Sequence, residues 1–167
     1  MGNWKRDRKI EAIRKYIGNV GGSWPAYSYG EIPEQNAINA CNSYAGAVEY
    51  QNILGLIDTT IWGNGKKGMI FTEYKIYFDN GMFESRGSIS YKEINDSGVI
   101  PGEVFGASYN GEALKELLSI LASIEGENYH DTVNEWENTI DDLTQGVQEV
   151  ANVIEKGLKL INDIFNL

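Results

Sequence analysis

Residues 53–73 read ILGLIDTTIWGNGKKGMIFTE. The stretch opens with a run from Ile53 to Trp62 that is rich in apolar and β-branched residues. Its apolar residues lie on both faces, which is typical of a strand covered on both sides. Residues 63–67 are rich in glycine and predict a turn, and Met69 to Glu73 again have strand character. The pattern predicts two neighbouring strands of a buried sheet.

Further strand signals follow on the C-terminal side. Residues 75–78 have strand character, and residues 79–81 (Asp-Asn-Gly) predict a hairpin, because Asn and Gly tolerate positive φ. Apolar and polar residues alternate over residues 87–92, as in a half-buried strand. Weaker signals lie at residues 99–100 and 104–109. Short strands and tight turns predict an α+β protein with an antiparallel curved sheet or a partly open barrel.

Helices are expected before these strands. Ile10, Ile13 and Ile17 share one face at helical spacing, which predicts a helix over residues 4–17 that ends at Gly18. A second helix is expected to begin near Pro33, since proline suits the first helical turn. Its buried stripe is expected to contain Ile38, Cys41, Ala45 and Val48.

A third helix is expected to close the sheet. Asn110 is suited to the N-cap position, and Gly126 is suited to end the helix. Between them, apolar residues recur at helical spacing, which predicts a helix that packs on the core. These residues are Leu114, Leu117, Leu118, Leu121 and Ile124.

The remaining residues predict one long amphipathic helix. Thr132 and Glu135 have the spacing of a capping box. Apolar residues then alternate at spacings of three and four over three heptads, as at positions a and d of a coiled coil. These residues are Val133, Trp136, Ile140, Leu143, Val147, Val150 and Ile154. A helix of thirty-odd residues extends roughly 50 Å, so we expect this seam to need a partner surface.

These elements suggest three parts along a chain of 167 residues, which is long enough to build a core. Residues 1–49 are expected to form N-terminal helices that pack on the core. Residues 50–126 are expected to form the antiparallel β domain, closed by a helix. Residues 127–167 are expected to form the association helix.

Composition argues against several classes of function. The net charge is −10, and thirteen acidic residues against three lysines lie from residue 101 onward. This balance disfavours nucleic-acid binding, which needs clustered cations. Cys41 and His130 are the sole cysteine and histidine, which disfavours a disulfide or a zinc site, and no cofactor is expected. With neither a signal-like start nor a long apolar stretch in the sequence, we expect a cytoplasmic protein.

Short segments of the sequence match catalytic or nucleotide-binding motifs in part, but the residues around them do not form the elements that those motifs require. Residues 63–68 match G-x-G-x-x-G, but a strand follows where the dinucleotide-binding motif requires a helix. We interpret Asp58 as a residue that orders the following turn by accepting hydrogen bonds from backbone amides. Lys66 and Lys67 at the tip of the loop could bind an anion or a lipid headgroup. An enzyme whose carboxylate site involves Asp58, Glu73 or Glu93 is a further alternative.

One segment resembles a known family. Residues 52–72 contain the pattern IDTT-x-x-G-x-x-K-x-G-x-x-FT and continue to Ile76-Tyr77-Phe78, and residues 90–94 read SYKEI. Together they resemble uncharacterised bacterial proteins with a pleckstrin-homology-like domain, over about residues 50–125. The resemblance implies a bent antiparallel sheet closed by a C-terminal helix. It also implies a binding or scaffold role and no catalytic residues.

The leading interpretation is a non-catalytic interaction or scaffold module. It would self-associate or bind a partner protein through six residues of the last helix: Trp136, Ile140, Leu143, Val147, Val150 and Ile154. The alternative is peripheral binding to an anionic membrane surface through Lys66, Lys67 and the C-terminal apolar face. The acidic composition disfavours that alternative, because anionic lipids repel acidic surfaces.

Overall fold

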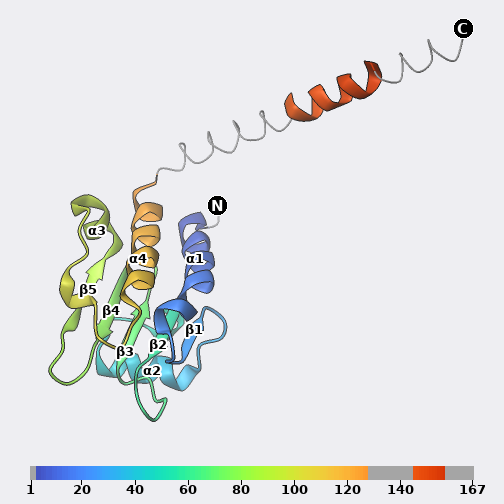
Figure 1. The fold of residues 1–167 in the computed structure, drawn as a ribbon. Helices are drawn as coiled ribbons and strands as arrows, with labels where there is room; N and C mark the ends of the chain where they lie inside the picture. The colour runs from blue at the N-terminus through green and yellow to red at the C-terminus, as the bar shows by residue number, and fades with distance from the viewer. Residues whose placement is uncertain (1–2, 128–144, 157–167) are drawn as a thin grey trace, which may run out of the picture. The chain divides into compact units, whose positions relative to one another are not determined.

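The computed structural model describes residues 3–127 and 145–156. The chain divides into one unit that ends at Gly126 and a second that comprises residues 127–167, of which residues 145–156 are described as a helix. The elements of the first unit are α1 (Trp4–Gly21), β1 (Ala26–Ser28), α2 (Glu34–Ser43), the 3₁₀ turn η1 (Tyr50–Asn52), β2 (Gly55–Asp58), β3 (Gly68–Phe71), β4 (Lys75–Asp79), β5 (Arg86–Ser90), α3 (Tyr91–Ser97), the 3₁₀ turn η2 (Gly102–Val104) and α4 (Gly111–Gly126) (Figure 1).

The strands form one antiparallel sheet in the order β1-β2-β3-β4-β5. The predicted α+β class and antiparallel sheet are confirmed. Within the described residues β1 and β5 are the edges of this sheet, so it is open and does not close into a barrel. Every residue of the two strands β2 and β3 is buried, as the apolar run around Ile57 and Ile70 predicts.

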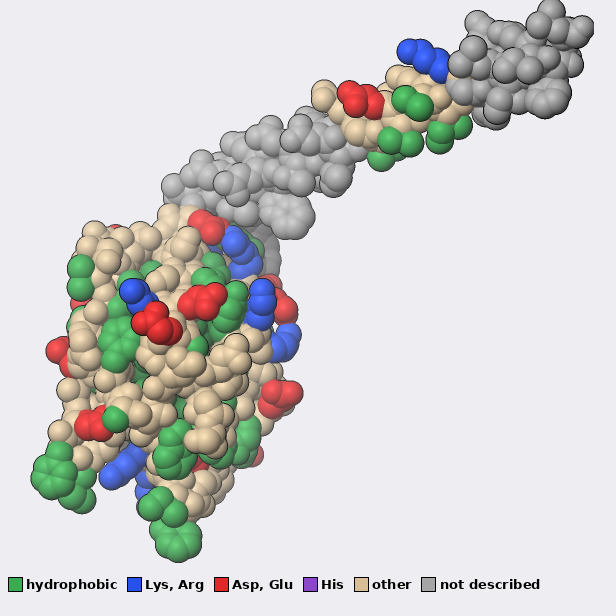
Figure 2. Space-filling view, viewed as in Figure 1, with side chains coloured by type: hydrophobic (Ala, Val, Ile, Leu, Met, Phe, Trp, Pro, Cys, Tyr) green, Lys and Arg blue, Asp and Glu red, His purple; other side chains and the backbone are tan. Residues whose placement is uncertain are grey.

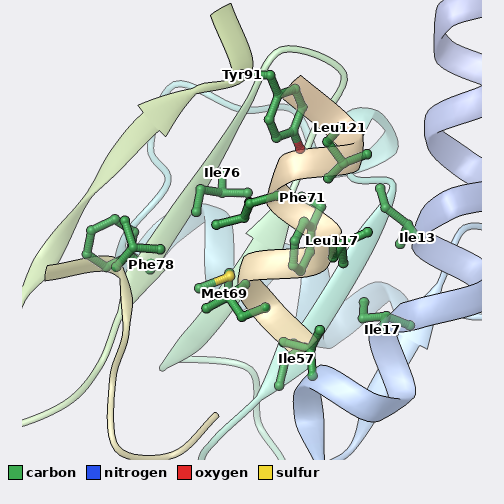
Figure 3. Close-up of a cluster of buried hydrophobic side chains, with 14 of the residues drawn as sticks. Ile13, Ile17, Ile57, Met69, Phe71, Ile76, Phe78, Tyr91, Leu117 and Leu121 are labelled. Atoms are coloured by element: carbon green, nitrogen blue, oxygen red, sulfur yellow. The ribbon is translucent and has the colours of Figure 1, made fainter. Parts of the chain in front are cut away.

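Helices cover both faces of the sheet. In the register, Leu56 pairs with Ile70, and these side chains pack with α2 in one cluster. Ile57 pairs with Met69, and these side chains pack on the opposite face with α1 and α4. In the close-up of that second cluster, Leu117 and Leu121 of α4 lie against the sheet beside α1 (Figure 3). The first unit is therefore a three-layer arrangement with the sheet in the middle.

Gly55 allows α1 to approach the sheet closely. A Cβ atom at this position would lie 2.7 Å from Cγ2 of Ile13 and 2.8 Å from Cδ1 of Ile17. Both isoleucines belong to the predicted buried face of α1, and both are buried in the structure. A side chain at position 55 would push the helix away from β2.

The N-terminal elements differ from the prediction at three places. Helix α1 runs past Gly18 to Gly21, because the burial of Val20 outweighs the helix cost of a glycine, about 1 kcal/mol. Strand β1 was not predicted, since three residues are too few to show a periodicity. Helix α2 begins after Pro33 as predicted but ends at Ser43, so Ala45 and Val48 follow the helix.

The predicted strands at residues 99–100 and 104–109 are wrong, since the structure has a 3₁₀ turn and loops in this region. The strand predicted over residues 87–92 ends at Ser90, where α3 begins. The Ser90 side chain accepts a hydrogen bond from the Glu93 backbone N–H, and the Glu93 carboxylate accepts from Ser90, which completes a capping box. The capping box therefore starts a helix at Tyr91, although the alternation of apolar and polar residues predicts that the strand continues to residue 92.

Lys9 is a fully buried lysine that joins three elements of the first unit. Its Nζ forms an ion pair with the carboxylate of Glu125 in α4 and donates to the backbone carbonyl of Glu73 at 2.6 Å, between β3 and β4. The same ammonium lies 5.0 Å from the ring centroid of Tyr91, which begins α3. A buried charge is tolerated only when it is paired and hydrogen-bonded, as here.

We expect Lys9→Met to lower the free energy of unfolding by about 3 kcal/mol, because it leaves the Glu125 carboxylate without its partner. Urea denaturation measures this change. Arg14→Met is the control, since Arg14 pairs with Glu11 on the exposed side of the same helix, and we expect it to cost less than about 1 kcal/mol. Equal losses in the two variants would contradict the prediction.

Candidate functional site

The carboxylate of Asp58, at the end of β2, orders the loop between β2 and β3. The residue is fully buried. Oδ1 accepts hydrogen bonds from the backbone N–H and the hydroxyl of Thr60, at 2.9 and 2.5 Å. Oδ2 accepts from the backbone N–H of Gly65 at 2.9 Å and from the side-chain amide of Asn36 at 3.0 Å. The interpretation of Asp58 as a residue that orders the following turn is confirmed.

Helix α2 supports the same loop from outside. Asn36 also donates to the carbonyl of Gly63 at 3.0 Å, and Asn39 donates to the carbonyl of Asn64 at 2.8 Å. Gly65 packs so closely on this helix that a Cβ atom would lie 2.5 Å from the carbonyl oxygen of Asn36. The loop is thus fixed by hydrogen bonds and by packing, which reduces its conformational freedom before any ligand binds.

The tip of this loop exposes two large apolar side chains, Ile61 and Trp62, at 86% and 87%. The predicted strand from Ile53 to Trp62 is therefore wrong at its C-terminal end, because β2 ends at Asp58. The hydrogen bonds from Thr60 to Asp58 turn the chain there. Periodicity alone shows that these residues are apolar but cannot show where the strand ends.

The loop between β4 and β5 has a similar tip. Met82 is 73% exposed and Phe83 is 99% exposed. The Asp79 carboxylate accepts from the N–H of Gly81 at 3.0 Å, as is typical of the predicted turn. Phe83 has φ 73, and it is the sole non-glycine residue with positive φ among the described residues. A bulky side chain in this conformation indicates backbone strain.

Both loops lie at the same end of the sheet, because in an antiparallel meander alternate connections fall on the same side. Figure 2 shows apolar side chains projecting at two points from this end of the first unit. We call the four exposed side chains Ile61, Trp62, Met82 and Phe83 the loop-tip surface. The sequence pattern does not indicate this surface, although it does indicate the lysines of the first loop.

Cations lie behind the loop-tip surface. Lys66 and Arg86 are exposed and Lys67 is half-buried. The Ser43 hydroxyl donates to the carbonyl of Lys66 at 2.8 Å, and the Ser43 carbonyl accepts from the guanidinium of Arg86. Ser43 therefore joins the first loop to the start of β5. Among the ion pairs between described residues, none involves these three cations.

The second predicted site is the seam of the last helix. Val147, Val150 and Ile154 belong to the described helix and are 57–71% exposed. Val153, which the seam does not include, is exposed beside them. The other three predicted contacts lie outside the described residues: Trp136, Ile140 and Leu143.

The three carboxylates of the enzyme alternative lie in different parts of the first unit. Asp58 ends β2 at the loop-tip end, and Glu73 lies in the turn between β3 and β4 at the other end. Glu93 belongs to the capping box of α3, where hydrogen bonds from Ser90 lower the pKa of its carboxyl group. Asp58 is thus separated from the other two by the length of the sheet, whereas Glu73 and Glu93 both lie at the end where Lys75 pairs with Ser90.

Other chemistry in the described part of the chain is limited. No group of three or more His, Cys, Asp or Glu side chains there is arranged to hold a metal ion. Over the same residues, no helix has the length and apolar character needed to cross a membrane. Burial raises the pKa of the Cys41 thiol, in keeping with its predicted place in the core.

Comparisons with protein-family models, curated proteins and solved structures found no match.

We expect Asp58→Ala to lower the free energy of unfolding by about 3 kcal/mol or more, because the buried donors of Gly65 and Asn36 lose their acceptor. Asp79→Ala is the control, since Asp79 accepts one hydrogen bond in the other loop and should cost about 1 kcal/mol. Urea denaturation measures both. An Asp58→Ala variant as stable as Asp79→Ala would show that the Asp58 network does not stabilise the loop.

Phe83 provides a test of backbone strain. We expect Phe83→Gly to be more stable than Phe83→Ala by about 1 kcal/mol, because glycine adopts positive φ without steric cost. Both variants remove the aromatic ring, so the difference between them reports the backbone alone. Thermal unfolding of the two variants measures it, and an alanine variant that is the more stable would exclude a left-handed conformation at this position.

Proposed function

We propose that this protein is a non-catalytic interaction module that self-associates through its last helix. The observation that supports the proposal is the helix described over residues 145–156, which carries Val147, Val150 and Ile154 of the predicted seam. Their spacing of three and four residues places all three on one face of the helix. Such a stripe loses contact with water only when another surface covers it.

A second copy of the same helix is the partner that the spacing favours. In the heptad frame, Val147 and Ile154 occupy position a and Val150 occupies position d. β-branched residues at position a favour two-stranded parallel coiled coils when leucine is at position d, and β-branched residues at both positions favour three or four strands, so the seam predicts a dimer or a larger assembly. Helices of about twelve residues are marginal in water by themselves, so burial of this face would also stabilise the helix. Each buried valine or isoleucine contributes roughly 1.5–3 kcal/mol before the costs of association.

The finer fold assignment is also part of the proposal. A pleckstrin-homology-like relationship is supported by the antiparallel meander and by a helix, α4, that follows the strands. The absence of a catalytic step, the absence of a cofactor and the cytoplasmic location are inferences from sequence.

We expect light scattering of the full chain at tens of micromolar to give the mass of a dimer or a larger assembly. Val147→Asp combined with Ile154→Asp should shift the mass to that of a monomer, because two carboxylates would have to be buried in the seam. The control is Gln148→Asp combined with Asn152→Asp, which adds the same charge at positions b and f of the same helix.

We expect the control to keep the mass of the unmodified protein. A monomeric unmodified protein would contradict the proposal. So would a seam variant and a control variant that dissociate to the same extent, because the effect would then arise from net charge alone.

A further inference from the structure

We propose that the loop-tip surface inserts into the headgroup region of an anionic lipid bilayer. This binding is separate from self-association and uses different residues. It also differs from the membrane alternative drawn from sequence, because it needs no part of the C-terminal apolar face. Its apolar contacts are Ile61, Trp62, Met82 and Phe83, and its cations are Lys66, Lys67 and Arg86.

The shape of the surface favours a bilayer over a protein partner. The four side chains project from two separate loops, and Figure 2 shows these projections standing out from the first unit. Protein interfaces bury their strongest contacts in well-packed, fully desolvated pockets. Projecting apolar side chains instead suit a lipid bilayer, because each loop tip can insert into it without a preformed pocket. Trp62 and Phe83 are aromatic, and aromatic side chains suit environments that are wet at one end and apolar at the other.

The two loops are fixed before any ligand binds. Asp58 and α2 hold the first loop, and within the second loop the backbone N–H groups of Asn80 and Glu84 donate to the carbonyls of Ser85 and Gly81. Insertion therefore need not order the loops, which removes one cost of binding. The positive φ of Phe83 is consistent with a functional role, because strained residues cluster at ligand-binding sites.

The charges around the loops select an anionic surface. Three cations lie behind the tips and form no ion pair with a described residue. The second loop also carries Asp79 and Glu84, which accept hydrogen bonds from the N–H groups of Gly81 and Ala107 at 3.0 and 3.2 Å and keep their negative charges. The attraction to an anionic surface therefore rests mainly on Lys66 and Lys67 of the first loop. Lysine and arginine side chains near an anionic leaflet are attracted by its negative surface potential, so lipid phosphate and carboxylate groups fit this end of the unit.

Co-sedimentation of the full chain with vesicles tests the proposal. One set of vesicles contains phosphatidylcholine and phosphatidylserine, and the other contains phosphatidylcholine alone. We expect the unmodified protein to bind the mixed vesicles more tightly. Trp62→Ser combined with Phe83→Asn should weaken binding to both sets, roughly tenfold or more on the mixed vesicles. Lys66→Gln combined with Lys67→Gln should weaken binding by roughly tenfold on the mixed vesicles and leave the neutral ones unchanged.

The matched control is Tyr74→Ser combined with Val99→Ser, which removes two exposed apolar side chains outside the two loops. We expect it to bind both sets of vesicles within about twofold of the unmodified protein, because burial of the loop tips carries the affinity. Thermal unfolding of each variant shows that the fold is kept. Asparagine at position 83 tolerates positive φ, so loss of binding there does not arise from misfolding.

Three outcomes overturn the proposal. The first is an unmodified protein that does not sediment with the mixed vesicles. The second is a tip variant that sediments as well as the unmodified protein, which would place lipid binding elsewhere in the chain. The third is a tip variant that keeps its vesicle binding but changes its mass in light scattering, which would make the loop-tip surface a contact between copies of the chain.

Discussion

The buried carboxylate of Asp58 is the constraint on which the loop-tip end of the molecule depends. An ionised carboxylate is stable in a protein interior only when hydrogen-bond donors surround it. Its donors come from both ends of the following loop and from α2, through Thr60, Gly65 and Asn36. The loop therefore folds back onto the helix. The residues between its two anchored ends, Thr60 and Gly65, project away from the core. The exposure of Ile61 and Trp62 follows from this arrangement.

The opposite end of the first unit depends on a second buried charge. Lys9 connects α1 to α4 through Glu125 and to the turn between β3 and β4 through the Glu73 carbonyl. The two ends thus use the same device, a fully buried ionisable side chain whose partners come from several elements. Between them the sheet is held by apolar packing on both faces, and Gly55 sets how closely α1 can lie against β2.

Much of the fold could be predicted because long elements carry a repeated signal. The leucines of α4 and the isoleucines of α1 identify their helices, and the run around Ile57 identifies a strand buried on both faces. Short elements cannot be predicted in this way, because they contain too few residues to show a periodicity. Strand β1 is defined by its pairing with β2, and α3 by one capping box at Ser90. At the loop-tip end, the residue types correctly predicted that Lys66 and Lys67 lie in a loop and that Asp58 orders it. The apolar tips were not predicted, because a pattern of apolar residues does not show which of them the fold leaves in water.

Ser43 has a consequence for how the molecule opens locally. Its hydroxyl donates a hydrogen bond to the Lys66 carbonyl in the β2–β3 loop, and its carbonyl accepts one from the Arg86 guanidinium at the start of β5. The end of α2 therefore contacts both segments. Proteins open in cooperative segments rather than residue by residue. A fluctuation that detaches the end of α2 therefore breaks the contact to the first loop and the contact to Arg86 together. The first loop and the start of β5 are therefore coupled through Ser43, although nearly twenty residues of sequence separate them.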